Sequence, residues 1–324
     1  MWELLIWINL FIGSYIVIFY AADLFLDNLK IICIIYNLSP LIIGMLVLGI
    51  DPEESIASII SAFNGLPYIS MGNIIGNSII AMTLPFAIAL MVKSIELHRT
   101  SLFYIILIFA LLIVVLLGLT INFFFLISGI LTLIFYVIYF AWNVKNNSKK
   151  EERIETATLP IVEDNIELEN TQEIVKSRKI LLIVIGFVFI FLGGELLILS
   201  ADKILEIIQI SEAFFGFVVI GFVTNVEELT LVIKSIKREA TEIGIGGMIG
   251  KVIWNLSFTY GISSIIIMNI AFNITLIVNI FILLIVFILY SFFLRSKLLK
   301  RSHGLVLFLI FIFYLSFNFY AIKI

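Results

Sequence analysis

The sequence predicts an all-α membrane protein in which ten transmembrane helices form two inverted five-helix repeats. Three observations lead to this fold class. Hydrophobic residues make up 62% of the 324 residues and charged residues only 13%, about half the charged share of a typical soluble domain. Runs of about twenty apolar residues, the length that crosses a bilayer core, recur along the chain. An acidic pair followed by a glycine motif occurs twice at the same spacing.

The apolar runs define ten expected spans, and each is expected to be helical because only a helix satisfies its own backbone hydrogen bonds in lipid. The spans of the first half are residues 2–26, 38–63, 73–94, 101–118 and 122–143. The spans of the second half are residues 178–201, 212–237, 245–268, 272–294 and 304–323. No Lys or Arg precedes the first apolar run, so we expect it to remain as a helix and not to be cleaved as a signal peptide.

One polar segment separates the two halves. Residues 144–177 are rich in Lys, Glu, Asn and Thr, and such a composition cannot bury enough apolar surface to form a core. We therefore predict a first five-helix repeat over residues 1–143, a polar linker over 144–177 and a second five-helix repeat over 178–324. A regulatory role for the linker is the alternative.

Nearly all of the 20 Lys and Arg residues fall in the linker and in the loops after the first, third, seventh and ninth spans. Because Lys and Arg are retained on the cytoplasmic side, this distribution predicts a cytoplasmic linker and extracytoplasmic termini in an integral protein of the cell (plasma) membrane. The expected partners are the lipid bilayer and inorganic cations, with no nucleic acid. The sequence does not indicate an oligomeric state. The single cysteine, Cys33, excludes an intramolecular disulfide and a multi-cysteine metal centre.

A shift of 174 residues brings the two halves into register at their least lipid-like positions. The aligned positions are Glu53-Glu54 with Glu227-Glu228, Gly72 with Gly246, and Gly76 with Gly250. Because each half has an odd number of spans, the second copy would enter the membrane with opposite polarity, as in the inverted repeats of many secondary transporters. The Gly-x-x-x-Gly stretches are typical of close helix packing, which would also bring the residues that follow them toward the acids.

Both acidic pairs lie within expected spans, where an ionised carboxylate costs about 2.5–3.5 kcal/mol at the bilayer centre. This cost indicates a functional role. The alternative is that the acids lie at helix ends and face water. Pro52 removes a backbone donor, and Thr224 and Asn225 can bond to the backbone, so we expect both helices to be interrupted mid-span. Carboxylates and freed carbonyls are hard oxygen ligands, which predicts alkali or alkaline-earth cations and not zinc or copper.

At these positions the chain resembles the Ca²⁺:cation antiporter superfamily, which includes the sodium/calcium exchangers, as a divergent member. The first repeat reads GIDPEESIAS and later SMGNIIGNSIIA, and the second reads ISEAFFGFVVIGFVTNVEEL and later GGMIGKVIWN. The family carries a Gly-Thr-Ser-Leu-Pro-Glu-like segment followed by Gly-Asn-x-Ile-Gly-Ser in each of two repeats. The resemblance implies a secondary active antiporter, not an enzyme, that exports Ca²⁺ in exchange for Na⁺ or H⁺ by alternating access. The first and sixth spans would slide, and no organic cofactor is implied.

The resemblance also implies that Glu54 and Glu228 are the main ligands of the transported ion. Whether Glu53 or Glu54 is the ligand stays open, because the first repeat is shorter and Glu53 directly follows Pro52. The further candidate ligands are Asp51, Thr224, Asn225, Asn77 and Asn255. Most of these depart from the family's pattern, so several expected Na⁺ ligands are missing.

Lys251 stands where the family has serine. An ammonium about 4 Å from a carboxylate is worth on the order of 4 kcal/mol at an effective dielectric constant of 20, enough to hold the acid ionised. We therefore expect a tethered charge in a former Na⁺ site, which would change the counter-ion stoichiometry and allow exchange against H⁺. The alternative is a lysine that snorkels to the membrane interface.

Other functions stay open. The transported ion could be different, as in a Na⁺/H⁺ antiporter or a carrier of another divalent metal. A non-transporting, ion-sensing membrane protein with the same fold is a further alternative, because many ligand positions have changed. An intramembrane protease would need a paired-aspartate, Ser-His or zinc-ligand arrangement, and both histidines, His98 and His303, lie in or beside loops.

Overall fold

The computed structural model describes residues 2–35, 51–92, 94–96, 102–147, 172–225, 241–293 and 298–323. This part of the chain is almost entirely helical. Its two strands, β1 (Ile95–Glu96) and β2 (Leu298–Leu299), are short and pair antiparallel, with Ile95 opposite Leu299. Apolar side chains dominate the helices because lipid leaves the backbone no other hydrogen-bond partners.

The helices of the first half are α1 (Trp2–Ile35), α3 (Pro52–Phe63), α4 (Pro67–Val92), α5 (Leu102–Thr120), the 3₁₀ turn η1 (Asn122–Phe124) and α6 (Phe125–Asn147). Those of the second half are α7 (Gln172–Ile208), α8 (Glu212–Phe214), the π-helical η3 (Phe215–Ile220), α9 (Gly221–Thr224), α11 (Thr241–Trp254), the π-helical η4 (Asn255–Thr259), α12 (Tyr260–Ile267), α13 (Ile274–Phe293), α14 (Arg301–Tyr320) and the 3₁₀ turn η5 (Ala321–Lys323). Segments α8, η3 and α9 follow one another directly, as do α11, η4 and α12.

Within the described ranges, seven helices are long and apolar enough to cross a membrane. They cover Trp2–Leu29, Pro67–Val92, Phe103–Thr120, Asn122–Asn143, Lys176–Ile208, Ile274–Phe293 and Arg301–Tyr320. The expected spans 38–63 and 212–237 lie partly outside the described residues, as does most of the expected linker, and the expected span 245–268 contains the π-helical η4. The all-α architecture is as predicted, and the number of ten spans stays a prediction.

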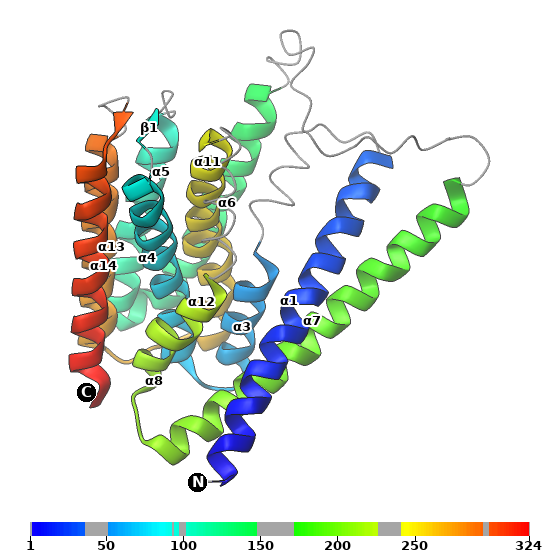
Figure 1. Ribbon diagram of the computed structural model, residues 1–324, viewed down its shortest axis with the longest axis horizontal. Coiled ribbons are helices and arrows are strands. Elements are labelled where there is room, and N and C mark those ends of the chain that lie inside the picture. Colours follow the sequence, from blue (N-terminus) through cyan, green and yellow to red (C-terminus); the bar gives the residue numbers. More distant parts are fainter. Residues whose placement is uncertain are drawn as a thin grey trace.

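Helix α4 lies at the centre of the molecule, between α3, α13, α14 and the η3 segment (Figure 1). Most of its residues are buried, whereas most residues of α1, α6 and α7 are not. The outer helices expose large apolar side chains such as Ile12, Val137 and Phe187. In water these side chains would form an aggregation-prone surface, and in a bilayer they face hydrocarbon.

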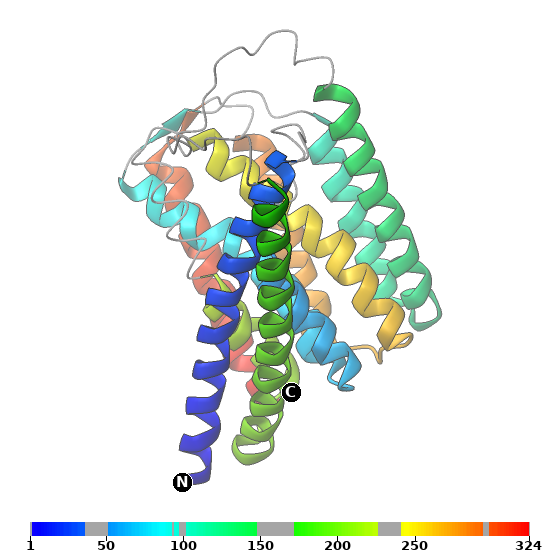
Figure 2. The same cartoon turned by 90° about the vertical axis from the view of Figure 1, so that its right-hand side faces the viewer.

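Helices α1 and α7 form a long antiparallel pair that stands at an angle to the other helices (Figures 1 and 2). Small residues bring the two backbones together: a Cβ at Gly186 would lie 3.0 Å from the carbonyl oxygen of Ala21. On its inner side α7 packs on α3, where a Cβ at Gly194 would lie 2.6 Å from Ile60. Apolar residues of the pair pack together with residues of α3 and η3, such as Ile60 and Phe215.

Two pairs of helices at matching positions in the two halves run in opposite directions. Helix α1 rises from the end of the molecule where both termini lie, and α7 descends toward that end (Figure 1). Helices α6 and α14 show the same opposition. The 174-residue shift found in the sequence places each of these helices in register with its counterpart.

Candidate functional site

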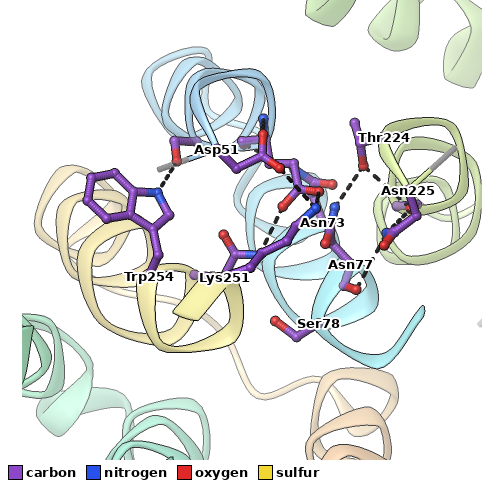
Figure 3. A network of polar contacts seen from close by, with 12 residues as sticks. Asp51, Asn73, Asn77, Ser78, Thr224, Asn225, Lys251 and Trp254 are labelled. Carbon is purple, nitrogen blue, oxygen red and sulfur yellow. Dashed lines mark hydrogen bonds and ion pairs between the residues drawn. The ribbon is translucent and has the colours of Figure 1, made fainter. Parts of the chain in front are cut away.

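The candidate site lies where the start of α3, the middle of α4, the end of α9 and the junction of α11 with η4 meet (Figure 3). Its polar residues are Asp51 and Glu54 from α3 and its cap, Asn73 and Asn77 from α4, Thr224 and Asn225 from α9 and the residue after it, Lys251 from α11, and Asn255 from η4. All of them except Asp51 are buried. Residues far apart in the sequence thus form one polar cluster inside an apolar protein.

The start of α3 positions the acids. Pro52 is the first residue of the helix, where its missing N–H leaves no hydrogen bond unmade. Asp51 is the N-cap, and its Oδ1 accepts a hydrogen bond from the Glu54 backbone N–H at 3.2 Å. The positive end of the helix dipole favours carboxylates in this first turn. The sequence predicted Pro52 as a mid-span interruption; in the structure it begins α3, and residues 36–50 lie outside the described chain.

Lys251 joins the two acids in a buried ion pair. Its Nζ lies 2.9 Å from Asp51 Oδ2 and 2.5 Å from Glu54 Oε1. The side chains of Lys251 and Glu54 are only 5% and 2% exposed, so the lysine points into the protein and not to the membrane surface. Charges so far from water are tolerated only in close contact with opposite charges, and removing one partner of such a pair typically costs about 3–5 kcal/mol.

Further donors hold Glu54 from two other elements. Its Oε2 accepts a hydrogen bond from Asn255 Nδ2 at 2.9 Å, and its backbone carbonyl accepts one from Asn73 Nδ2 at 3.2 Å. Asn255 is the first residue of the π-helical η4, a type of helix that is frequent at functional sites. Glu54 is therefore fixed by α3, α4, α11 and η4 together. Glu53 is also buried, at 7% exposure.

Four buried asparagines supply acceptor oxygens that no described group satisfies. The Oδ1 atoms of Asn73, Asn77, Asn225 and Asn255 have no hydrogen-bond partner in the described part of the chain, although each Nδ2 donates. A buried acceptor without a donor costs about 1–3 kcal/mol. Amide oxygens are ligands for hard cations, which would remove this cost.

The end of α9 is tied to α4 on the other side of the site. Asn77 Nδ2 donates to Thr224 Oγ1 at 2.8 Å, and Asn225 Nδ2 donates to the carbonyl of Gly221 at 2.7 Å (Figure 3). Thr224 and Asn225 bond to backbone carbonyls, as the sequence suggested, and the expected interruption of this helix stays a prediction because residues 226–240 lie outside the described chain. The second expected acidic pair, Glu227 and Glu228, lies outside the described residues.

Glycines allow α4 and η3 to approach closely enough for these contacts. A Cβ at Gly76 would lie 2.6 Å from the carbonyl oxygen of Phe217, and one at Gly72 would lie 3.1 Å from that of Ala213. From the opposite side, a Cβ at Gly216 would lie 2.6 Å from the carbonyl of Ile69. The Gly-x-x-x-Gly stretch of α4 is therefore a helix-packing motif.

Sequence reasoning missed several residues of the site. Trp254 Nε1 donates to Ser55 Oγ at 2.7 Å, and Ser55 Oγ is 2.9 Å from Thr259 Oγ1, so a second polar chain joins α3 to η4. Asn73 was also not among the candidate ligands expected from the sequence. It precedes Asn77 by four residues, which places both on one face of α4, and this spacing was the available signal.

The chemistry of the site favours hard cations. Within the described residues, no group of three or more His, Cys, Asp and Glu side chains is placed to hold a metal ion. The groups present are carboxylate, amide and hydroxyl oxygens, together with one ammonium. Such oxygens suit alkali and alkaline-earth cations.

Comparisons with known proteins agree with this chemistry. The family model described as "Sodium/calcium exchanger protein" matches residues 6–145 and 178–320. An uncharacterized membrane protein of Methanocaldococcus jannaschii is 27% identical over 264 residues, covering 81% of this chain and 82% of the relative. The inner membrane protein YrbG of Escherichia coli K12 is 24% identical over 272 residues, covering 79% of each chain.

Solved structures of the sodium-calcium exchanger NCX_Mj share the fold. The structure soaked with 10 mM Na⁺ and zero Ca²⁺ is 23% identical, covers 97% of this chain and 99% of its own, and gives a TM-score of 0.59. The structure soaked with 100 mM Na⁺ and 10 mM Sr²⁺ is 23% identical, covers 97% and 98%, and gives a TM-score of 0.60.

Proposed function

The chain belongs to the sodium/calcium exchanger family, and from this premise we propose that it exports Ca²⁺ in exchange for Na⁺ or H⁺ by alternating access. The observation that carries the proposal is the carboxylate of Glu54. It is 2% exposed in an apolar, membrane-type fold, and side chains from α4, α11 and η4 converge on it. An acid that is this costly to bury indicates a cation-binding role.

We assign the binding of the transported cation to oxygen ligands around this acid. Glu54 is the central ligand in the described chain, because its carboxylate meets Lys251 and Asn255. The other proposed ligands are Asp51, Glu53, Asn77, Asn255, Thr224, Asn225 and Glu228. The buried, unsatisfied amide oxygens of the asparagines support their inclusion.

The proposed architecture is ten spans in two inverted repeats, over residues 1–143 and 178–324, joined by a linker over 144–177. The opposite directions of α1 and α7, and of α6 and α14, support the inversion. The family match falls on both proposed repeats and leaves out residues 146–177, which supports the division. In this proposal the α1–α7 pair slides over α3 and exposes the site to each side in turn.

The proposed location is the plasma membrane, with both termini extracytoplasmic and the linker cytoplasmic. Both termini lie toward one end of the molecule (Figure 1). The basic residues Arg178, Lys179, Lys300 and Arg301 lie near the starts of α7 and α14, at the opposite end. Retention of Lys and Arg on the cytoplasmic side supports this orientation.

Uptake of ⁴⁵Ca²⁺ into proteoliposomes tests the function. An imposed outward Na⁺ gradient or an imposed proton gradient should drive uptake by the wild type, and Glu54→Gln should reduce it to the level of protein-free liposomes. Glu206→Gln is the matched control, because Glu206 is exposed and pairs with Lys203 away from the site. Absence of uptake under both gradients would contradict Ca²⁺ antiport.

The ion pair of Lys251 with Glu54 favours a transported cation other than Ca²⁺, because a fixed ammonium takes a position that a transported cation would otherwise use. An antiporter for another cation, such as Na⁺/H⁺ or a different divalent metal, is therefore the second candidate. Competition by unlabelled cations against the transported ion separates the two. Cation-dependent thermal stabilisation without any flux would instead identify an ion-sensing protein.

A further inference from the structure

We propose that Trp254, Ser55 and Thr259 are positioning residues for cation binding. They form an indole–hydroxyl clamp between α3 and η4, which holds the Glu54 carboxylate against the Asn255 amide without itself binding the ion. This inference rests on the proposed transport function and deepens it, because it assigns part of the affinity for the cation to residues outside the ligand set.

The clamp lies directly beside two ligands in the sequence. Ser55 follows Glu54 in the first turn of α3, and Trp254 precedes Asn255 at the junction of α11 with η4. Two links therefore join the same two segments. Asn255 Nδ2 donates to Glu54 Oε2 at 2.9 Å, and Trp254 Nε1 donates to a hydroxyl of α3 at 2.7 Å (Figure 3). A displacement of η4 against α3 that breaks the second link also moves the first.

The π-helical η4 allows two residues to meet one hydroxyl. Trp254 and Thr259 are five residues apart, and side chains at this spacing point about 140° away from each other on an α-helix. In a π-helix the i→i+5 hydrogen bonds bring such residues to one face. Ser55 Oγ accordingly lies 2.7 Å from Trp254 Nε1 and 2.9 Å from Thr259 Oγ1. The change of helix type is therefore part of the clamp.

Other aromatic rings hold Trp254 in place. Its ring stacks on Phe258 with centroids 4.1 Å apart, and it meets Tyr136 of α6 edge-on at 5.2 Å. All three clamp residues are buried, so the indole has little room to turn away from Ser55. An indole N–H only donates, which excludes the Trp254 nitrogen as a cation ligand. Its effect on an ion has to act through the ligands beside it.

The clamp differs from the contacts inside the site in one respect. The hydrogen bond from Asn255 to Glu54 uses the carboxylate that an ion would bind, whereas the clamp uses none of the proposed ligand atoms. Its contacts therefore do not have to break when a cation arrives. Groups that orient ligands in this way are worth about 10–100-fold in metal affinity.

The Ca²⁺ dependence of ⁴⁵Ca²⁺ uptake into proteoliposomes tests the clamp. Trp254→Phe removes the indole N–H and keeps an aromatic ring against Phe258. We expect its KM for Ca²⁺ to rise about ten-fold with little change in the maximal rate. Trp142→Phe is the matched control, because this indole is 41% exposed and stacks on Phe103. An unchanged KM in Trp254→Phe overturns the inference.

A pair of smaller substitutions separates positioning from packing. Thr259→Val removes the hydroxyl at nearly constant shape, whereas Thr259→Ser keeps the hydroxyl and removes a methyl group. If the hydroxyl positions the ligands, KM should rise in Thr259→Val and stay near the wild-type value in Thr259→Ser. Equal KM values for the two variants contradict the inference.

A measurement without transport follows the unfolding midpoint in detergent as Ca²⁺ is added. Trp254→Phe, Ser55→Ala and the double variant should each need about ten-fold more Ca²⁺ than the wild type for the same stabilisation. The double variant should resemble the single variants, because both act through one hydrogen bond. A lower midpoint with an unchanged Ca²⁺ dependence would show a purely structural role and overturn the inference.

The two measurements separate failure of the inference from failure of the proposed function. If the wild type transports Ca²⁺ and the clamp variants keep its KM, the function holds and only the inference is overturned. If Ca²⁺ is not transported and does not stabilise the wild type, both fail. If Ca²⁺ stabilises the wild type without transport, the antiport proposal fails and the midpoint series still decides the role of the clamp.

Discussion

The carboxylate of Glu54 receives two strong contacts in a place that water hardly reaches: the ammonium of Lys251 and the amide of Asn255. The sequence predicted that Lys251 approaches the acids, because it follows the glycine motif that aligns with α4. Its simultaneous contact with Asp51 and Glu54 could not be predicted, since that depends on where α3 begins. The start of α3 is set by the cap and by tertiary packing, which hydropathy does not report.

Replacing Asn255 with aspartate should lower the stability of the protein in the absence of cations and raise its affinity for a divalent cation. The new carboxylate would lie at the position of an amide 2.9 Å from Glu54 Oε2, so like charges would repel in the empty site and attract a divalent cation more strongly. We expect Asn255→Asp to lower the unfolding midpoint without Ca²⁺ and to increase the stabilisation by added Ca²⁺. Asn122→Asp, at an exposed position between α5 and α6, is the control. Equal responses of the two variants would contradict the placement of Asn255 in the cation site.

At the scale of helices, the backbone contact between α4 and η3 fixes the distance between the two halves of the site. Apolar runs predicted most of the long helices, because length and hydrophobicity determine them. They did not predict the π-helical segments η3 and η4. The change from α-helical to π-helical hydrogen bonding depends on contacts with other helices, such as the packing of Gly72 and Gly76 on η3.

Gly76→Ala should be strongly destabilising. The added methyl group would lie 2.6 Å from the Phe217 carbonyl oxygen, a backbone atom that moves only with the whole η3 segment. Overpacking of this kind typically costs about 1–3 kcal/mol or more. In contrast, Gly13→Ala in α1 meets nothing within 4 Å and should be neutral or stabilising by up to about 1 kcal/mol. Unfolding midpoints of the two variants in detergent should differ accordingly, and equal midpoints would argue against the close packing.

Tyr314→Phe tests a second link of η3, this time to α14. The Tyr314 hydroxyl donates to the carbonyl of Phe217 at 2.5 Å, and its removal leaves a buried acceptor. We expect a loss of about 1–3 kcal/mol of unfolding free energy. Tyr20→Phe, at a side chain that is 68% exposed, should have no measurable effect. A Tyr314→Phe protein as stable as the wild type would show that the bond does not hold η3.

At the scale of the whole molecule, the odd number of expected spans in each half predicted that matching helices run in opposite directions, and α1 with α7 and α6 with α14 do so. The tilt of the α1–α7 pair away from the other helices could not be predicted from the sequence. An apolar residue has the same hydropathy whether it faces lipid or a neighbouring helix, so hydropathy does not report how helices are arranged. The small residues of this interface, including Gly186, carry no signal of which helix they face.

Cysteine labelling in intact cells tests the orientation. In a Cys33→Ala background, Tyr320→Cys should react with a membrane-impermeant maleimide, because this residue is 82% exposed at the end of α14 where the termini lie. Ser302→Cys, at the exposed start of the same helix, should react only after the membrane is permeabilised. The reverse pattern would invert the proposed topology.

The short β1–β2 pair joins the chain just after α4 to the chain just before α14. Near the same point, Gly304 allows α14 to approach Leu90 of α4, since a Cβ there would lie 2.7 Å from the Leu90 side chain. At this end, main-chain hydrogen bonds and side-chain packing therefore hold α4 and α14 together. Parting α4 from α14 at this end would break both contacts, so the proposed transport cycle leaves these two helices together there and assigns the movement to α1 and α7.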